Sequence, residues 1–347
     1  MIKNSIKILL VFICVSFTIK SIKTTPYVFK KVDYFPEMPL PKANPITNEG
    51  VELGRFLFYD TLLSVDTSIS CASCHQQQYA FADNQSFSQG VLKTNLNRNT
   101  MPLFNLAWYR SLFWDGRATT VEEQVFFPVR AHDEMGLNWT EVEKRIKSSP
   151  FYKPLFKKAF GNQKIDSVLI AKSIAQFERT LISVDSKYDR VLNGLDYFTP
   201  EEYEGYGLVN DQTKGGCLHC HITDGNGLGT NLSFSNNGLD KISIDSGLYH
   251  STNNFKDIGK FKVPSLRNLG FTAPYMHDGR FSSLEEVLDF YSEGVQSNSN
   301  IDSKMTFAHQ GGNHLTEDEK HKIILFLNTM NDTVFVNNKN FSNPFTN

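Results

Sequence analysis

Two short stretches decide how this sequence is interpreted: Cys71-Ala-Ser-Cys-His75 and Cys217-Leu-His-Cys-His221. In each, two cysteines three residues apart are followed directly by a histidine. On a short helical segment, thiols at positions i and i+3 lie on the same side, and the histidine follows at a fixed offset. The chain therefore carries two copies of one local arrangement of thiols and imidazole.

This arrangement is the attachment signature of c-type haem, in which both thiols form thioethers and the histidine ligates the iron. Two alternatives use the same cysteines. Cysteines of an exported protein commonly form disulfides, and two Cys-x-x-Cys pairs can supply a zinc site. Neither alternative explains a histidine at the same offset in both copies. The pattern predicts two covalent haem c groups held by Cys71, Cys74, Cys217 and Cys220, with His75 and His221 as iron ligands.

The length and composition are those of a globular protein with more than one domain. The chain has 347 residues, of which 40% are hydrophobic and 21% charged, which excludes a largely disordered chain. The formal net charge of −2 gives no indication of a nucleic-acid-binding surface. We expect an N-terminal haem domain over 25–192, a C-terminal haem domain over 193–337 and a tail over 338–347, with the junction within 189–204.

The N-terminus has the pattern of an export signal. Lys3 and Lys7 precede an apolar run over 8–17, which also contains the fifth cysteine, Cys14. The run is shorter than the roughly 20 residues of a membrane span. Because no clear small-residue cleavage site follows, a retained anchor stays open as an alternative. We expect residues 1–24 to direct the protein to the periplasm, which leaves four cysteines in the mature chain.

A second repeat follows the two cysteine motifs. Trp114-Asp-Gly-Arg117 recurs as His277-Asp-Gly-Arg280, and each Asp-Gly-Arg indicates a turn. After each turn a hydroxyl residue precedes a glutamate by three positions, which predicts a capping box at the start of a helix. The expected pairs are Thr119 with Glu122 and Ser282 with Glu285. Two related haem domains explain both repeats.

Apolar spacing elsewhere predicts a mostly α fold with long loops. Val142, Ile146, Ile170, Ile174 and Phe177 recur at helical intervals. A capping box of Thr316 and Glu319 opens a further amphipathic helix over 317–327.

Segments around these motifs carry a resemblance to a known family: 63–66, 70–75, 98–99, 113–117, 123–124, 134–136, 216–221, 264–268 and 272–279. In this order they resemble the bacterial di-haem cytochrome c peroxidases, which include the MauG-type enzymes that oxidise tryptophans of a partner protein. The resemblance covers about 50–330. It implies two all-α cytochrome c-like domains whose haems face a shared interface. It also implies that the first haem reacts with peroxide and that the second accepts and relays electrons.

The resemblance assigns three residues to catalysis. Glu134 matches the family's catalytic glutamate, which takes a proton from one peroxide oxygen and returns it to the other. Gln124 matches the distal amide, which hydrogen-bonds peroxide or its water. Trp114 matches the aromatic residue between the haems, which can carry electrons. Without the resemblance, these would be a loop carboxylate, a helix-surface amide and a core aromatic residue.

The resemblance also implies a calcium site at the domain interface. Its ligands are Asn99 and the main-chain carbonyls of Thr272 and Pro274. One amide and two carbonyls leave several positions for water, which oxygen-ligated Ca²⁺ accepts.

The first haem departs from the pattern of many family peroxidases. Those carry a histidine shortly after the first motif, which caps the resting iron. Here no histidine lies between His75 and His132, and segment 87–93 offers no strong ligand. We therefore expect a first iron that is open or water-bound in every state, with no need for reductive activation. His132 is the alternative ligand.

The second haem also departs from the pattern. Electron-relaying members place a methionine where this sequence has Tyr291. MauG-type enzymes use tyrosine as an axial ligand in this domain, and an oxygen ligand favours oxidised iron. We expect Tyr291 to ligate the second iron, with Met276 and Met305 as the alternatives.

Three functions compete. The favoured one is a peroxidase that reduces hydrogen peroxide with electrons from a small cytochrome c or cupredoxin. The second is a MauG-like oxidase that uses peroxide to oxidise a protein or another external reductant. The third is an electron carrier, which gains nothing from an open first site with Glu134 and Gln124. The family often forms homodimers, so a homodimer is a further possibility that the resemblance leaves open.

Overall fold

A computed structural model describes residues 23–223 and 227–346, and its regular structure is mostly helical, as the sequence predicts. Residues 1–22, which hold Cys14 and nearly all of the expected export signal, lie outside the described residues. In the ranges that are described, no helix combines the length and apolarity needed to cross a membrane.

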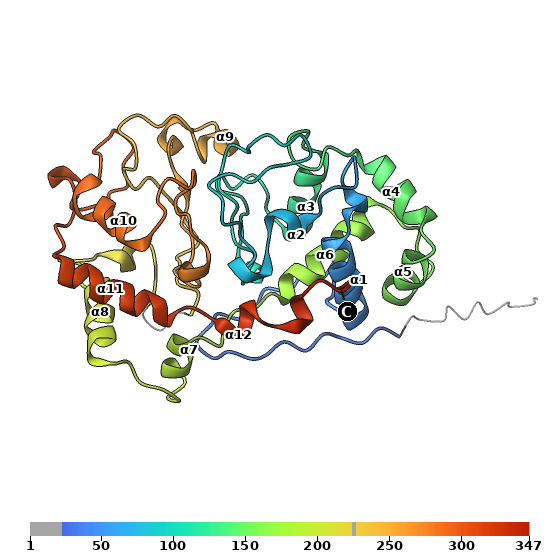
Figure 1. Ribbon diagram of the computed structural model, residues 1–347, viewed down its shortest axis with the longest axis horizontal. Coiled ribbons are helices and arrows are strands. Elements are labelled where there is room, and N and C mark those ends of the chain that lie inside the picture. Colours follow the sequence, from blue (N-terminus) through green and yellow to red (C-terminus); the bar gives the residue numbers. More distant parts are fainter. Residues whose placement is uncertain (1–22, 224–226, 347) are drawn as a thin grey trace, which may run out of the picture.

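The N-terminal half is built around the packing of α1 on α6 (Figure 1). Helix α5 packs against α1, and α3 packs against α6. Ile170, Ile174 and Phe177 are fully buried in this core, as the apolar spacing predicts, and Leu53 and Leu57 of α1 are fully buried with them. The helices of this half are α1 (Asn48–Tyr59), α2 (Cys71–Cys74), α3 (Val121–Arg130), α4 (Trp139–Ser148), α5 (Tyr152–Phe160) and α6 (Ser167–Thr180).

The C-terminal half has a second core, in which α8 packs on α11. Helix α7 (Lys187–Leu192) leads into this half, and the helices that follow are α8 (Pro200–Asn210), α9 (Tyr249–Thr252), α10 (Leu284–Asp289), α11 (Glu317–Thr329) and α12 (Thr333–Val336). Strands β1 (Phe234–Ser235) and β2 (Phe261–Lys262) are antiparallel, with Phe234 opposite Lys262. Helix α10 continues directly into a π-helical turn, Phe290–Gly294.

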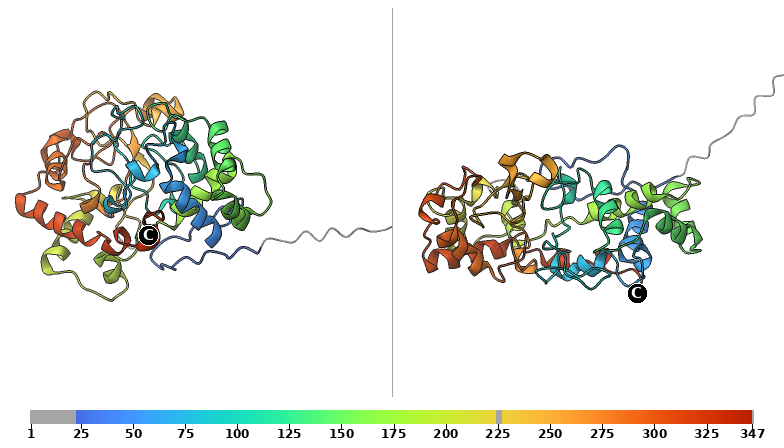
Figure 2. Two further views of the ribbon diagram at one scale, coloured as in Figure 1. Left: turned by 45° about the vertical axis from the view of Figure 1, so that its right-hand side comes forward. Right: turned by 90° about the horizontal axis from the view of Figure 1, so that it is seen from above.

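Segments near both ends of the described chain make contacts that connect the two halves. In the views of Figures 1 and 2, the segment before α1 runs along the molecule, and α12 returns from the C-terminal half toward the N-terminal half. Tyr34 donates a hydrogen bond to Asp189 at 2.9 Å, and Phe35 packs edge-on against Trp108. Phe341 is buried in the N-terminal core. The expected division into domains stays a prediction.

The helix caps confirm one prediction and correct another. Thr316 and Glu319 form the expected capping box at the start of α11. The predicted pairs at α3 and α10 are wrong by one residue, because the caps are Thr120 with Glu123 and Ser283 with Glu286. Each copy has two adjacent hydroxyl residues, so the sequence permits both registers. Glu122 instead forms a bidentate ion pair with Arg179, at 2.7 Å for both contacts.

Candidate active site

The two Cys-x-x-Cys-His motifs adopt short helical turns, α2 and the 3₁₀ turn Cys217–His219. Nδ1 of His75 donates to the carbonyl of Phe81 at 2.8 Å, and Nδ1 of His221 donates to the carbonyl of Pro264 at 3.0 Å. Such a bond fixes the tautomer and leaves Nε2 as the nitrogen that can ligate a metal. Burial lowers the pKa of both imidazoles, that of His221 to about 4, so both are neutral and able to coordinate.

The four described cysteines are free thiols, so the disulfide alternative gains no support. Burial raises the pKa of all four, which keeps them protonated near neutral pH. Among residues 23–223 and 227–346, no group of three or more His, Cys, Asp or Glu side chains could hold a metal ion, so the cysteine pairs do not form a shared zinc site.

Glu134 lies beside the first motif, in the turn that follows α3. Burial is the main cause of the raised pKa of the Cys71 and Cys74 thiols, and the charge of Glu134 adds to it at both. Burial, reinforced by Asp133, raises the pKa of Glu134 to about 7, and Arg117 opposes this rise. A carboxyl with such a pKa can both accept and return a proton near neutral pH.

The other residues predicted near the first motif are placed differently. Gln124 lies half-buried in α3, and no hydrogen bond joins it to Glu134 in the part of the chain that is described. His132 is exposed two residues before Glu134.

An arginine network that the sequence did not reveal connects this region to the C-terminal half. Arg117 lies 3.6 Å from the centroid of the Phe113 ring and donates to Asp115 at 2.9 Å and 3.0 Å. Arg98 joins the same Asp115, at 2.6 Å, to Asp245 of the C-terminal half, at 2.7 Å. Asp115 therefore holds both arginines, one of which affects the pKa of Glu134.

Trp114 reaches from the N-terminal half into the second site. It is 9% exposed, and its indole Nε1 donates to the carbonyl of Asn99 at 2.8 Å. Its own carbonyl accepts a hydrogen bond from the main-chain N–H of Lys262 at 2.9 Å. The side chain lines the cavity that contains the second cysteine motif.

The three residues expected at a calcium site, Asn99, Thr272 and Pro274, line this same cavity. The Asn99 amide Nδ2 donates to the carbonyls of Gln85 and Ser86 at 3.1 Å and 3.3 Å. With its nitrogen used in this way, the amide retains its oxygen as a potential metal ligand.

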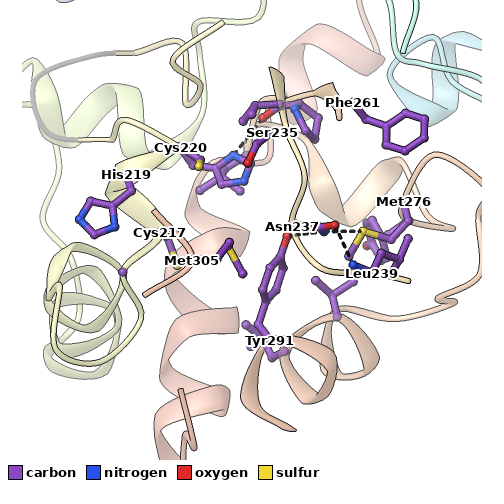
Figure 3. Close-up of a pocket in the computed structure, with 18 of the residues that line it drawn as sticks. Cys217, His219, Cys220, Ser235, Asn237, Leu239, Phe261, Met276, Tyr291 and Met305 are labelled. Atoms are coloured by element: carbon purple, nitrogen blue, oxygen red, sulfur yellow. Dashed lines mark hydrogen bonds between the residues drawn. The ribbon is translucent and has the colours of Figure 1, made fainter. Parts of the chain in front are cut away.

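The second site brings the expected iron ligands together (Figure 3). The Tyr291 hydroxyl accepts a hydrogen bond from Nδ2 of Asn237 at 3.1 Å, and the same nitrogen lies 3.7 Å from the sulfur of Met276. Met305 lines the cavity as well. Burial raises the pKa of Tyr291 to about 12. The three candidate ligands are thus neighbours, and Asn237 contacts two of them.

Several buried polar groups have no hydrogen-bond or ion-pair partner among the described residues, among them the neutral Oγ of Ser235 and Oδ1 of Asn313. Two ionisable groups lie near the cysteine motifs. One is Oε2 of Glu178, whose charge affects Cys71 of the first motif. The other is the Lys262 ammonium, whose side chain lines the second cavity. Native proteins pair nearly all such groups. Unpaired polar groups near both motifs therefore fit two sites that each hold a further polar group, as haem with its propionates would supply.

Comparison with known proteins accounts for this combination of features. A family model described as di-haem cytochrome c peroxidase matches residues 48–196. The methylamine utilization protein MauG of Methylorubrum extorquens is 35% identical over 309 residues, which cover 84% of this chain and 81% of that protein. The cytochrome c551 peroxidase of Nitrosomonas europaea is 33% identical over 300 residues, covering 85% and 84%.

The chain belongs to the di-haem cytochrome c peroxidase family. The resemblance that its motifs carry is thereby confirmed, and the chain is an oxidoreductase of a family whose members hold two haems.

Solved structures agree with this membership of the di-haem peroxidase family. A MauG-like protein associated with microbial copper homeostasis superposes with a TM-score of 0.83 at 31% identity, covering 92% of this chain and 99% of that one. The diheme peroxidase BthA of Burkholderia thailandensis gives a TM-score of 0.76 at 21% identity, over 90% and 92%. The similarity to BthA bears on the fold alone. The predicted mostly α architecture is confirmed.

Proposed function

We propose that this protein is a di-haem c-type peroxidase that reduces hydrogen peroxide to water, with electrons from a small cytochrome c or cupredoxin. The observation that carries this proposal is Glu134, a half-buried carboxyl near the first haem motif whose pKa is raised to about 7. A protein that only transferred electrons would have no use for a proton-transferring group at this position.

The cysteine motifs hold two haem groups in this proposal. Cys71 and Cys74 attach the first through thioethers, and Cys217 and Cys220 attach the second, with His75 and His221 as proximal ligands. Each haem iron supplies one-electron chemistry, and the first also supplies a site at which peroxide can bind. Tyr291 ligates the second iron. Asn99, Thr272 and Pro274 bind Ca²⁺.

Glu134 performs the proton transfer. Its carboxylate accepts the proton of one peroxide oxygen, and the resulting acid returns it to the departing oxygen, which leaves as water. Gln124 donates its amide hydrogen to peroxide and orients it. Arg117 lowers the pKa of Glu134 against the opposing effect of burial, so both protonation states are accessible near neutral pH.

Trp114 carries electrons from the second site to the first. Its hydrogen bond to Asn99 and its position in the lining of the second cavity support this role. The proposed export signal 1–24, and the family to which the chain belongs, support a periplasmic location. The divisions 25–192 and 193–337 are proposed as the two haem domains.

A MauG-like oxidase is the second candidate. Tyr291 favours it, because an oxygen ligand stabilises oxidised iron and suits a site that holds oxidising equivalents. The MauG protein of Methylorubrum extorquens is also among the similar relatives. In that case the reductant is a protein or another external molecule, and the same residues serve the first haem.

Steady-state turnover with a defined donor distinguishes these functions. The fully oxidised holoenzyme is mixed with peroxide and a reduced small cytochrome c, without prior reduction. The proposal predicts immediate oxidation of a pair of one-electron donors for each peroxide consumed. Peroxide consumption that leaves cytochrome and cupredoxin donors reduced would favour the oxidase. No consumption of peroxide would contradict both enzymatic functions.

A further inference from the structure

Lys262 occupies an unusual place, at the contact between the two halves. It lies in β2, and its main-chain N–H donates to the carbonyl of Trp114 at 2.9 Å. Lys262 is 4% exposed, and its side chain lines the second cavity together with Trp114, Cys220 and His221. Two residues further on, the carbonyl of Pro264 accepts the hydrogen bond that orients His221.

The Lys262 ammonium has no counter-charge in the part of the chain that is described. Within residues 23–223 and 227–346, the ammonium interacts with the ring of Tyr109 alone, whose centroid lies 4.5 Å from Nζ. Desolvation alone lowers its pKa to about 7, and no carboxylate acts against that effect. A cation–π contact recovers less free energy than the burial of an ammonium costs.

Neighbouring cations in the sequence are paired with carboxylates, and Arg267, five residues further along the chain, is the first example. It is also fully buried, but Asp189 binds its guanidinium, with one contact at 2.9 Å. Lys260, two residues before Lys262, is paired with Asp257 at 3.0 Å. Lys262 is therefore the exception among these three cations, and a negatively charged group is missing from its surroundings.

We propose that the Lys262 ammonium binds a propionate carboxylate of the second haem and holds it next to Trp114. This inference rests on the proposed function, because it needs a haem attached through Cys217 and Cys220 in this cavity. The propionates are the only anionic groups at the edge of a haem. A haem in the cavity would therefore supply the charge that Lys262 lacks, and the ammonium in turn would fix the haem edge at the contact between the halves.

The ion pair also acts on the second iron. Oxidation of a haem adds one positive charge, which a nearby ammonium disfavours and an unpaired propionate favours. Lys262 therefore makes the second haem easier to reduce than it would be with an uncompensated propionate. In this role Lys262 is a positioning residue, which acts through the propionate and does not touch the reacting peroxide.

The test is a potentiometric titration of the full-length holoenzyme, followed by the absorbance of each haem. Lys262→Met removes the charge at similar length, Lys262→Arg keeps it, and Lys260→Met is the matched control in the same segment. We expect a shift of the second haem to more negative potential in Lys262→Met. Lys262→Arg and Lys260→Met should stay at the wild-type potential, and the first haem should be unaffected in all three variants.

Several outcomes would overturn this inference without touching the proposed function. They are a wild-type potential in Lys262→Met, an equal shift in Lys262→Arg, and a shift confined to the first haem. If Lys262→Met loses the second haem while Lys262→Arg retains it at the wild-type potential, the requirement for charge is upheld. The wild-type titration separately tests the proposed function, because a protein with fewer than two haems contradicts that function itself.

Discussion

The two copies of the Asp-Gly-Arg repeat form nearly the same turn in two different surroundings. Leu112 pairs with Ala118 in the first copy, and Tyr275 pairs with Phe281 at the equivalent positions of the second. Trp114 and His277 occupy matching places, and both bond to Asn99. The carbonyl of Asn99 accepts from the Trp114 indole, and its N–H donates to the carbonyl of His277, both at 2.8 Å.

The glycine of each turn also lies in close contact with a residue of the opposite half. Gly116 has a φ of +71°, and a Cβ there would lie 2.5 Å from the Phe234 ring. Gly279 has a φ of +62°, and a Cβ there would lie 2.6 Å from Cα of Ser86. The repeat therefore builds the contact between the halves from both sides.

The copies differ in the helix that follows each turn. Counted from the aspartate of the turn, Gln124 in the first copy corresponds to Val287 in the second, and Pro128 corresponds to Tyr291. Proline offers no ligand, whereas Tyr291 points its hydroxyl into the second cavity, toward Asn237 (Figure 3). The same turn is thus followed by Gln124 and Pro128 in one copy and by Val287 and Tyr291 in the other, a difference that the proposed function assigns to an open first site and a closed second site.

The largest effect is expected at Glu134, which has no counterpart in the second site. Glu134→Gln keeps the shape but cannot accept a proton, so peroxide turnover should fall by about 10²- to 10⁴-fold. Asp133→Asn is the matched control, because its carboxylate is exposed beside Glu134. Steady-state kinetics with reduced cytochrome c measures both, and turnover of Glu134→Gln near the wild-type rate would remove this residue from the mechanism.

Tyr291→Phe removes the candidate iron ligand from the second copy, which then resembles the first in having none at this position. If Tyr291 ligates the second iron, its removal should open that iron and convert its low-spin spectrum to a high-spin one, while the first haem keeps its spectrum. Absorbance and electron paramagnetic resonance of the ferric protein report this change. A spectrum identical to that of the wild type would mean that Met276 or Met305 is the ligand.

The pH dependence of turnover tests how the charges of Asp133 and Arg117 set the pKa of Glu134. In the proposed mechanism the carboxylate form of Glu134 is the base, so turnover should rise with pH through about 7. Asp133 raises and Arg117 lowers the pKa of Glu134. Asp133→Asn should therefore move the inflection to lower pH, and Arg117→Met should move it to higher pH. Shifts in the reverse directions would contradict this arrangement of charges.

The smallest effects concern the stability of the contact between the halves. Gly279→Ala would place a methyl group against the main chain of Ser86, whereas Gly116→Ala would meet a ring that can turn aside. Gly194→Ala is the control, because it has a φ of +69° and nothing within 4 Å of its Cβ. We expect a loss of roughly 1 kcal/mol for Gly194→Ala and more for Gly279→Ala. Equal losses in thermal unfolding would show that the close contact has no energetic importance.

The sequence predicts the features that depend on neighbouring residues. The two Cys-x-x-Cys-His motifs and the repeat were recognisable because their chemistry lies within a few positions. The predicted helix caps lay one residue before the observed caps, Thr120 and Ser283. The choice between two adjacent hydroxyl residues depends on distant partners, such as Arg179 for Glu122. The sequence did not identify Lys262 and Asn237 as site residues for the same reason. Their surroundings arise only when β1, β2 and the turn after α10 come together.

In the proposed function the two irons differ, with the first open and the second closed by Tyr291. Electron paramagnetic resonance of the fully oxidised, resting holoenzyme tests it most directly. We expect one high-spin and one low-spin ferric haem, with no reduction needed to expose the first. Two low-spin signals would contradict it, because they would require a ligand on the first iron.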